Sequence, residues 1–416
     1  MTWVVIAIRN LLNNGRRSLF TIVAIMLGYA AVILFDGFTG YMYTGIKESV
    51  IFAQGSGHLT VFKSGFLEKG KLHPERYLIG KEEVETLQRI SEKMDNILVL
   101  APELHINGLI SNGQISTVFV AAGRVPSQLA RMKSQAKSRL ASAKYYQGEP
   151  LSDADIYGVG VGSILAEMMG FSAGSAEAVV IAPTVDGEMN ALDARIKQTI
   201  GAGNEVLDDK MMLVTLAFAQ RLYDTDAVDR VRILLRDEQL LPETVQALER
   251  AFAAQDLDLE IKKWIELSPF YIKVRNMFEV IFVFVFVIVI TVVAMSIINT
   301  LGMAIMERTR EIGTLRAMGI NRFGVIRLFV IESSILVLIG AALGLAIAVI
   351  VCFLIDLLQV TWVPPQVSVA VPLEIELLAG HMLVVFLFLE LLAVLAAFFP
   401  ARRAAFQTIV DALGHV

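Results

Sequence analysis

Four long apolar segments constrain the fold of this chain more than any other feature of its sequence. Each is long enough to cross a hydrocarbon layer of about 30 Å as a helix. The second contains the unbroken run IFVFVFVIVITVVAM, whose β-branched residues would also suit a buried strand. A run of this length has no place in a soluble sheet, so lipid is the better solvent for it. We therefore predict an α-helical membrane protein with four transmembrane helices, at residues 18–41, 277–303, 328–358 and 377–399.

Basic residues predict the orientation of these helices, because Lys and Arg beside a span remain on the cytoplasmic side. Arginines precede the first span, lie between the second and third, and follow the fourth, whereas residues 359–376 contain no Lys or Arg. Both termini, including the 400–416 tail, and the 304–327 connection are therefore expected in the cytoplasm. The 359–376 loop and the long segment between the first two spans are expected outside. The arginines that carry this assignment are Arg9, Arg16, Arg17, Arg308, Arg310, Arg316, Arg322, Arg327, Arg402 and Arg403.

Residues 1–17 mix apolar side chains with Arg and Asn in a pattern that fits a short amphipathic helix. Such a helix lies in the inner membrane interface and anchors the chain there. Basic residues followed by an apolar run also describe a cleaved signal peptide. The run is long for that role, and no convincing small-residue cleavage site follows it. We therefore expect the first span to be retained.

Residues 45–273 have the composition of a soluble fold and are too long for a loop. Short β-rich runs alternate with segments of helical apolar spacing, which predicts a large α+β domain inserted between the first and second transmembrane helices. We expect residues 123–203 to form a second module inserted into it. The strand-like runs are 58–62, 97–109, 115–121, 178–182, 231–235 and 257–264, and the helical patterns are 81–95, 213–223 and 242–254.

The sequence shows no pattern typical of catalysis or metal binding. Residues 65–71 have the glycine and lysine spacing of a phosphate-binding loop, but Leu72 replaces the hydroxyl residue that would hold magnesium. The glycines of 158–162 fall short of the dinucleotide pattern and are explained by a strand-to-helix turn. The net charge of −5 disfavours nucleic acid as a partner. The single cysteine, Cys352, and five histidines lack ligand spacing; the histidines are His58, His73, His105, His381 and His415.

The segment 306–319, between the second and third spans, is the most informative part of the chain. Apolar residues recur in it at helical spacing, and charged residues occupy the other faces. A helix of this kind offers a docking surface to a partner protein. From these residues alone, a solvated membrane-flanking helix is an equally good interpretation. The apolar positions are Ile305, directly before the segment, and Ile312, Leu315 and Met318, and the charged ones are Glu307, Arg308, Arg310, Glu311 and Arg316.

Two passages of this sequence resemble a known family. ERTREIGTLRAMGINRFGVIRLFVIESSILVLIGAALG and the ending PARRAAFQTIVDALGHV are similar to the corresponding regions of the ABC-transporter permeases related to MacB, FtsX and the lipoprotein-releasing LolC and LolE proteins. The order of one span, a large domain and three spans is also similar. The resemblance is greatest to LolC and LolE, through residues 264–275 and the expected lack of a fused nucleotide-binding domain. The REIGTLRAMG passage makes FtsX itself a poorer match.

The resemblance implies a non-catalytic permease subunit in the bacterial inner membrane, with its large domain in the periplasm. It implies partners: a second permease subunit, the same or related, and separate cytoplasmic ATPase subunits that bind ATP and magnesium. Residues 304–327 would contain the helix that couples to the ATPase. The substrate would be a lipoprotein, a lipid or another hydrophobic molecule, with a periplasmic carrier protein as a further partner. The coupling residues implied are Glu307, Arg308, Arg310, Glu311, Ile312, Leu315, Arg316, Met318 and Gly319.

The same resemblance implies that the first and second spans border a lipid-binding cavity. An alternative within the family is mechanotransmission, in which an FtsX-like subunit regulates a periplasmic cell-wall hydrolase or sensor and transports nothing. The residues implied for the cavity are Leu34, Phe35, Phe38, Tyr41, Phe278, Ile281, Phe282 and Phe286.

A few residues inside the predicted spans carry further expectations. Gly340 and Gly344 form a small-xxx-small site, which predicts close packing of the third span against a neighbouring helix. Carboxylates within a membrane are costly and are functional candidates by default. Glu332 lies about one turn from the cytoplasmic end, where it would pair with Arg327 or reach the interface. Glu390 lies near the middle of the fourth span, where it would have a conformational or proton-linked role or make an interhelical hydrogen bond.

Overall fold

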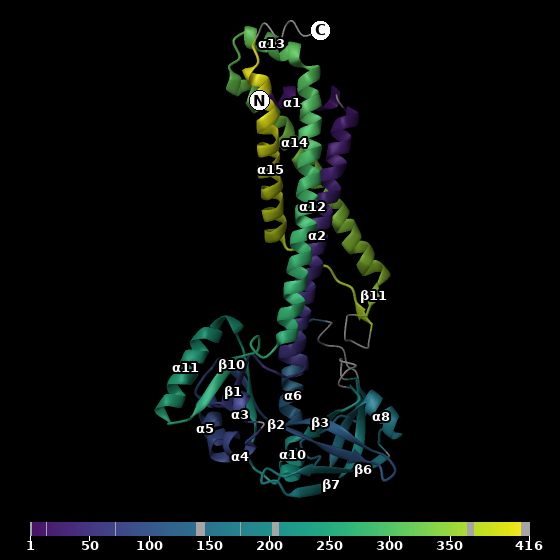
Figure 1. Ribbon diagram of the computed structural model, residues 1–416, viewed down its shortest axis with the longest axis vertical. Helices are drawn as coiled ribbons and strands as arrows, with labels where there is room; N and C mark the ends of the chain where they lie inside the picture. The colour runs from purple at the N-terminus through teal and green to yellow at the C-terminus, as the bar shows by residue number, and fades with distance from the viewer. Residues whose placement is uncertain are drawn as a thin grey trace. The chain divides into compact units, whose positions relative to one another are not determined.

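The computed structural model describes residues 2–13, 15–70, 72–138, 146–174, 176–201, 208–363 and 370–408. The chain divides into two compact units (Figure 1). The helical unit comprises Met1–Tyr43, Val274–Val360 and Leu373–Val416, and the sheet unit comprises Thr44–Lys273 and Thr361–Pro372.

Four helices in the described part of the chain are long and apolar enough to cross a membrane. A helix needs about 20 residues to span the hydrocarbon layer. The expectation of four apolar helices is confirmed. They are α2 (Gly15–Glu48), α12 (Pro269–Glu307), α14 (Arg322–Leu358) and α15 (Ala379–Phe406), accompanied by the short helices α1 (Thr2–Asn13) and α13 (Thr309–Ala317). A π-helical turn, η1 (Ser49–Ala53), continues α2.

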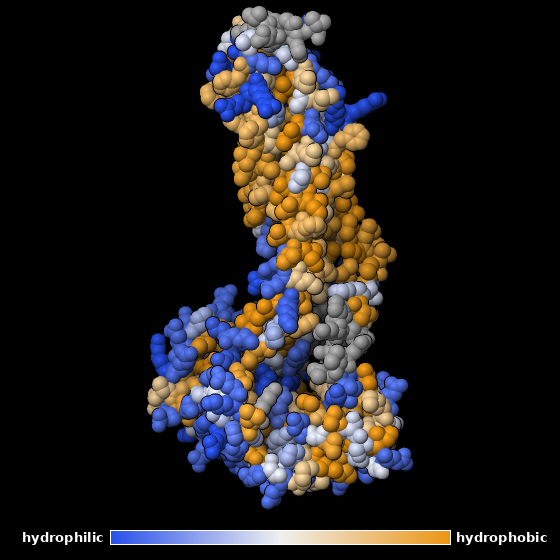
Figure 2. Space-filling model, viewed as in Figure 1, coloured by the Kyte–Doolittle hydropathy of each residue, from blue (hydrophilic) through white to orange (hydrophobic). Residues whose placement is uncertain are grey.

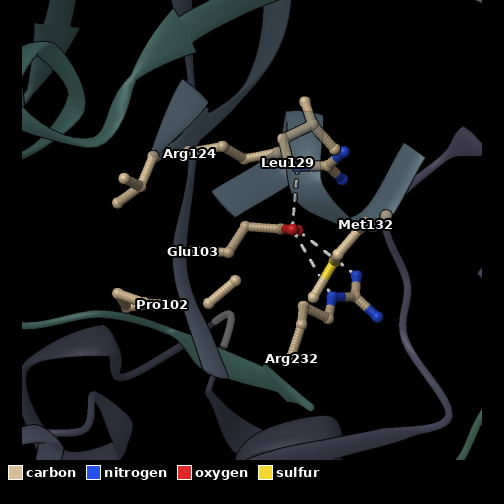
Figure 3. A pocket seen from close by; sticks show the side chains of 9 residues that line it. Pro102, Glu103, Arg124, Leu129, Met132 and Arg232 are labelled. Atoms are coloured by element: carbon tan, nitrogen blue, oxygen red, sulfur yellow. Dashed lines mark hydrogen bonds and ion pairs between the residues drawn. The ribbon is translucent and has the colours of Figure 1, made fainter. Parts of the chain in front are cut away.

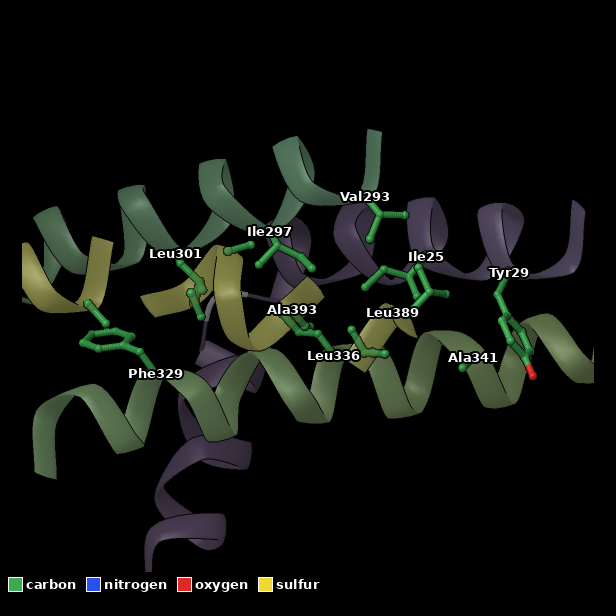
Figure 4. Close-up of a cluster of buried hydrophobic side chains, with 14 of the residues drawn as sticks. Ile25, Tyr29, Val293, Ile297, Leu301, Phe329, Leu336, Ala341, Leu389 and Ala393 are labelled. Carbon is green, nitrogen blue, oxygen red and sulfur yellow. The ribbon is translucent and has the colours of Figure 1, made fainter. Parts of the chain in front are cut away.

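The core of the helical unit is built from apolar side chains that all four long helices contribute (Figure 4). Large β-branched and leucine side chains alternate there with alanines, which let the helices approach closely. Residues that meet in this core include Ile25 and Tyr29 of α2, Ile297 of α12, Leu336 of α14 and Leu389 of α15.

The outer surface of the same helices is also apolar (Figure 2). On α12, Val280, Val283 and Phe284 leave 58–69% of their surface exposed. An exposed apolar surface this extensive is unfavourable in water, and acyl chains would cover it. The helices are therefore arranged as a bundle with an apolar inside and an apolar outside, as lipid requires.

Ten of the described strands of the sheet unit join in one sheet with the order β10-β1-β9-β2-β3-β8-β5-β7-β4, in which β6 pairs with β2 and β7. A separate two-stranded ladder pairs β11 (Thr361–Trp362) with β12 (Val371–Pro372). The strands of the large sheet are β1 (Leu59–Lys63), β2 (Ile97–Ser111), β3 (Ser116–Arg124), β4 (Tyr146–Gly148), β5 (Gly158–Gly162), β6 (Ala176–Pro183), β7 (Met189–Ile200), β8 (Met211–Thr215), β9 (Arg230–Leu235) and β10 (Leu259–Lys263).

Short helices cover this sheet. They are α3 (Phe66–Lys69), α4 (Pro74–Tyr77), α5 (Lys81–Glu92), α6 (Pro126–Lys133), α8 (Ser163–Met169), α10 (Leu216–Tyr223) and α11 (Leu241–Ala254), with the 3₁₀ turn η2 (Glu238–Leu240).

The long strand β2 takes part in the two larger hydrophobic cores of the sheet unit, and its Val99 enters a third, smaller one. Its first half pairs with β9, beside a core that includes Leu59, Ile233 and Leu248. Its second half pairs with β3 and β6, and Ile106 and Ile110 enter a second core. The segment expected as an inserted module, 123–203, contributes β4 to β7 to this same sheet.

One local expectation for the sheet unit was wrong. The helical pattern of 213–223 covers the end of strand β8 and then helix α10, which starts where the Thr215 side chain accepts a hydrogen bond from the Phe218 amide. The glycines of 158–162 form strand β5 between β7 and β8, and this strand leads directly into α8, whose N-cap is Gly162, as expected for a strand-to-helix turn. A side chain on Gly162 would lie 2.1 Å from the carbonyl oxygen of Asp208, so the strand needs glycine to fit.

Candidate functional site

Helix α13 is separated from both of its neighbouring helices by short breaks. Arg308 is its N-cap residue and has non-helical dihedrals, which ends α12 at Glu307. At its other end Gly319 has φ of +101°, a conformation that favours glycine. The side chain of Asn321 then caps α14 by accepting a hydrogen bond from the Gly324 amide at 2.7 Å. The sequence therefore builds α13 as a distinct short helix.

Helix α13 has one face in the core and one face exposed. Thr309, Ile312 and Gly313 are buried, and Ile312 belongs to the core of the helical unit. Arg310, Glu311, Thr314 and Met318 lie on the exposed surface, where Met318 leaves 70% of its surface accessible. The exposed face combines charged groups with a large apolar side chain, a composition suited to protein contact.

The structure separates the nine predicted coupling residues by environment. Glu307 is exposed and forms an ion pair with Arg17 of α2, with 2.6 Å between Nη1 and Oε1. Arg316 donates a hydrogen bond to the backbone carbonyl of Gln407 beyond α15. The buried Ile312 and the largely buried Arg308 contact their own chain, and Leu315 is half-buried. The residues left on the outer surface are Glu307, Arg310, Glu311, Met318 and Gly319.

Arg308 and Glu332 form a buried ion pair where α13 begins. Arg308 Nη1 lies 3.3 Å from Glu332 Oε1, and only 12% and 2% of the two side chains are exposed. Asn10 of α1 donates a hydrogen bond from Nδ2 to the same carboxylate oxygen at 2.6 Å. The expected pairing of Glu332 with Arg327 is wrong. Five residues along a helix rotate the side chain by about 140°, so Arg327 lies on another, exposed face of α14.

Five of the eight predicted cavity residues make aromatic contacts along α2 and α12, in one group of three rings and one separate pair. Phe35 stacks on Phe282 with 6.2 Å between ring centroids, and Phe282 stacks on Phe286 at 5.7 Å. Phe38 meets Phe278 edge to face at 6.0 Å. We call Phe35, Phe38, Phe278, Phe282 and Phe286 the aromatic ladder. The remaining three predicted residues lie around it: Leu34 packs on the core, Tyr41 is buried, and Ile281 is 39% exposed.

Phe388 of α15 extends the aromatic ladder and was missed in the sequence. Its ring centroid lies 5.2 Å from that of Phe286. Phe388 is one of many apolar residues in its helix, and no sequence pattern indicates which of them meets α12.

The two glycines predicted to pack a helix lie against α2. A Cβ atom on Gly340 would be 2.7 Å from Ile25 Cβ, and one on Gly344 would be 2.6 Å from the backbone oxygen of Met26. Real Cβ atoms do not approach other atoms this closely, so α14 and α2 touch backbone to backbone. Gly28 gives α2 a similar close approach to Val289 of α12.

Glu390 of α15 has a buried carboxylate oxygen. Its Oε2 atom has no hydrogen-bond partner among the residues that the structure describes. An unsatisfied buried polar atom is costly, which makes Glu390 a residue of interest within the span.

A buried charge cluster occupies the sheet unit and was not predicted (Figure 3). Glu103 of β2 is 1% exposed and lies between Arg124 of β3 and Arg232 of β9, at 2.9 Å and 3.2 Å. Burial alone would raise the pKa of the Glu103 carboxyl, but Arg124 and Arg232 outweigh it and hold the pKa well below its usual range. His105 approaches the same carboxylate at 3.2 Å. The cluster ties three strands together.

Replacing Glu103 by Gln is expected to destabilise the sheet unit, because it leaves two buried guanidinium groups without their counter-charge. Breaking a buried pair in this way costs about 3–5 kcal/mol. The depressed pKa means that the Glu103 contribution is present above pH ~4.5 and is lost as the pH falls below that value. Thermal unfolding of the full chain in detergent, followed by tryptophan fluorescence, should show a much lower unfolding temperature for the variant than for the unmodified chain at pH 7. The difference between the two unfolding temperatures should become smaller in acid. A difference in unfolding temperature that does not change with pH would contradict a stabilising role for the ionised Glu103 carboxylate.

A family model and curated relatives match this chain. Residues 283–409 match the FtsX-like permease C-terminal model. An ABC transporter permease of Methanocaldococcus jannaschii is 22% identical over 422 residues, which cover 99% of this chain and 97% of the relative. LolC of Neisseria meningitidis serogroup B, a lipoprotein-releasing system transmembrane protein, is 25% identical over 344 residues, which cover 79% of this chain and 81% of LolC. MacB proteins match over a shorter stretch.

Among solved structures, the periplasmic region of MacB from Actinobacillus actinomycetemcomitans superposes with a TM-score of 0.37 and 12% identity, covering 52% of this chain and 93% of that structure. The sequence comparisons confirm the family resemblance: the homologues of this membrane protein are ABC transporter permeases, LolC and MacB among them.

Proposed function

We propose that this chain, which carries an FtsX-like permease domain, couples a separate cytoplasmic ATPase to the extraction or movement of a lipoprotein or another hydrophobic molecule. The observation that carries the proposal is the two-sided environment of α13. One side is held in the core of the helical unit, and the other side presents charges and Met318 to solvent. A helix held in this way can receive a push from a bound protein and pass it to the spans.

The energy source in this proposal is ATP, bound with magnesium by the partner ATPase. The working assembly would contain two permease subunits and two ATPase subunits in the bacterial inner membrane. The arginines beside α2, α13 and α15 support cytoplasmic placement of these helix ends, with the sheet unit in the periplasm. The permease itself has a mechanical role.

The aromatic ladder supports a substrate with acyl chains. Phe35, Phe282 and Phe286 form a contiguous apolar surface along α2 and α12. Aromatic rings contribute large apolar contact areas. An acyl chain that packs against them removes apolar surface from water, which is favourable. The relative LolC belongs to a lipoprotein-releasing system, which is consistent with this substrate class.

The decisive experiment for the function is purification of the full chain with the ABC ATPases encoded in the same genome, followed by capture of bound cellular molecules. Co-purification of the ATPase together with acylated proteins or lipid supports release or transport. Capture of the ATPase with a cell-wall hydrolase, and without acylated cargo, would favour the FtsX-like alternative. Failure to bind any ABC ATPase would contradict both proposals.

Replacing Phe282 by Ala is expected to weaken binding of a fluorescent triacylated lipopeptide to the complex by about tenfold, because a buried aromatic side chain contributes about 1.5–3 kcal/mol. Phe284 provides a matched control, since it lies on the same helix but is 67% exposed. Fluorescence anisotropy in nanodiscs measures both affinities. Equal affinities for the Phe282→Ala and Phe284→Ala variants would exclude the aromatic ladder from substrate binding.

A further inference from the structure

We propose that Arg308 and Glu332 are positioning residues that fasten the start of α13 to α14 and α1. A push on α13 would then move these helices together, instead of bending the break between α12 and α13. This inference rests on the proposed function and deepens it, because it names the connection through which the ATPase would act on the spans.

The first argument is the connectivity of the pair. Arg308 lies in the break between α12 and α13, and Glu332 lies inside α14. Arg308 donates from Nη1 toward Glu332 and from Nη2 to the backbone carbonyl of Asn10 in α1, at 3.3 Å and 2.9 Å. Asn10 closes the triangle through its bond to the Glu332 carboxylate. One guanidinium group therefore joins three chain segments that are distant in sequence.

The second argument compares this pair with the other polar contacts around α13. The Arg17–Glu307 pair leaves 43% and 46% of its side chains exposed, and exposed pairs contribute little. The Arg316 contact with Gln407 is also exposed to solvent. The Arg308–Glu332 pair is buried, so separating its charges would leave each without compensation in an apolar surrounding. Of these contacts, it resists separation most strongly.

The third argument is the geometry of the cation. A guanidinium group is planar and directs its donors along fixed directions, so it can serve the Asn10 carbonyl and the Glu332 carboxylate at once. A lysine ammonium keeps the positive charge but lacks the planar set of donors that can bind both partners at once. Arg308→Lys therefore separates the role of the geometry from the role of the charge.

The first experiment uses the full chain alone in nanodiscs. Spin labels at Thr314 of α13 and Leu338 of α14, both exposed, report the distance between these helices once Cys352 is replaced by Ser. We expect Arg308→Lys and Glu332→Gln to broaden the distance distribution. The matched control is Arg327→Gln, which removes an exposed cation from α14, the helix that carries Glu332. Unchanged distributions in both Arg308→Lys and Glu332→Gln would overturn the proposal.

The second experiment adds the co-purified ABC ATPase. We expect Arg308→Gln and Glu332→Gln to bind the ATPase normally but to reduce permease-dependent ATP hydrolysis by about fivefold or more, with a double variant no worse than either single variant. Additive losses, or losses that follow weakened ATPase binding, would overturn the proposal. If Glu332→Gln does not yield a monodisperse protein, Arg308→Lys carries both tests. If the unmodified chain binds no ABC ATPase, the proposed function fails, whereas the spin-label result still decides whether the pair fastens α13.

Discussion

Replacing Glu311 by Arg is expected to uncouple the ATPase from the permease. Glu311 lies in the first turn of α13, where its charge is favourable near the helix N-terminus, and its side chain is exposed. Reversal of this charge places a cation on the surface proposed to dock the ATPase, and like charges across an interface cost several kcal/mol. We expect permease-dependent ATP hydrolysis to fall at least about tenfold, to the rate of the ATPase alone.

The matched control for this prediction is Arg327→Glu. It also reverses one exposed charge, but on α14 instead of α13. Size-exclusion chromatography of the complex and ATP hydrolysis in nanodiscs provide the two readouts. Full hydrolysis with Glu311→Arg, or an equal loss with Arg327→Glu, would show that α13 is not the coupling surface.

Replacing Gly344 by Leu is expected to prevent the helical unit from assembling. Even the first carbon of the new side chain would lie 2.6 Å from the backbone oxygen of Met26 and 3.2 Å from the ring of Tyr29. A backbone atom cannot move aside as a flexible side chain can, so α14 must separate from α2. Overpacking costs about 1–3 kcal/mol for small additions, and a leucine at a backbone contact is expected to exceed that range.

Gly344→Ala and Gly302→Ala give a graded and controlled form of this test. Gly302 of α12 has open space where a Cβ would be placed, so alanine there is expected to be neutral or to stabilise the helix by about 0.5–1 kcal/mol. Gly344→Ala is expected to lower the unfolding temperature in detergent, and Gly344→Leu to abolish a monodisperse peak. Equal behaviour of the two alanine variants would mean that α14 does not pack on α2 at this point.

The sequence was sufficient to locate the long helices and the short helix between the second and third of them. Unbroken apolar runs define a span without any knowledge of its neighbours, and the alternation of Ile312 and Leu315 with charged residues predicts a helix directly. The same local patterns did not reveal which charges face inward. Arg308 and Arg310 are two residues apart and look equivalent, yet Arg308 is largely buried against Glu332.

Partners that are distant in sequence account for most of what could not be predicted. Asn10 and Glu332 are separated by 322 positions, and Glu103 and Arg232 by 129. Their pairing depends on how the helices and strands pack, which no local spacing records. Unlike these polar pairs, the residues of the aromatic ladder were predicted, because the family resemblance indicated which two helices meet. Phe388 was missed because it comes from a third helix.

The long strand β2 has a mechanical consequence. It forms part of the two larger hydrophobic cores of the sheet unit, and its hydrogen bonds to β9 and to β3 follow one another without a linker. The two cores cannot separate unless the backbone hydrogen bonds of β2 to β9 or to β3 break. The sheet should therefore move as one rigid body, so that a displacement applied at one end is transmitted to the other end.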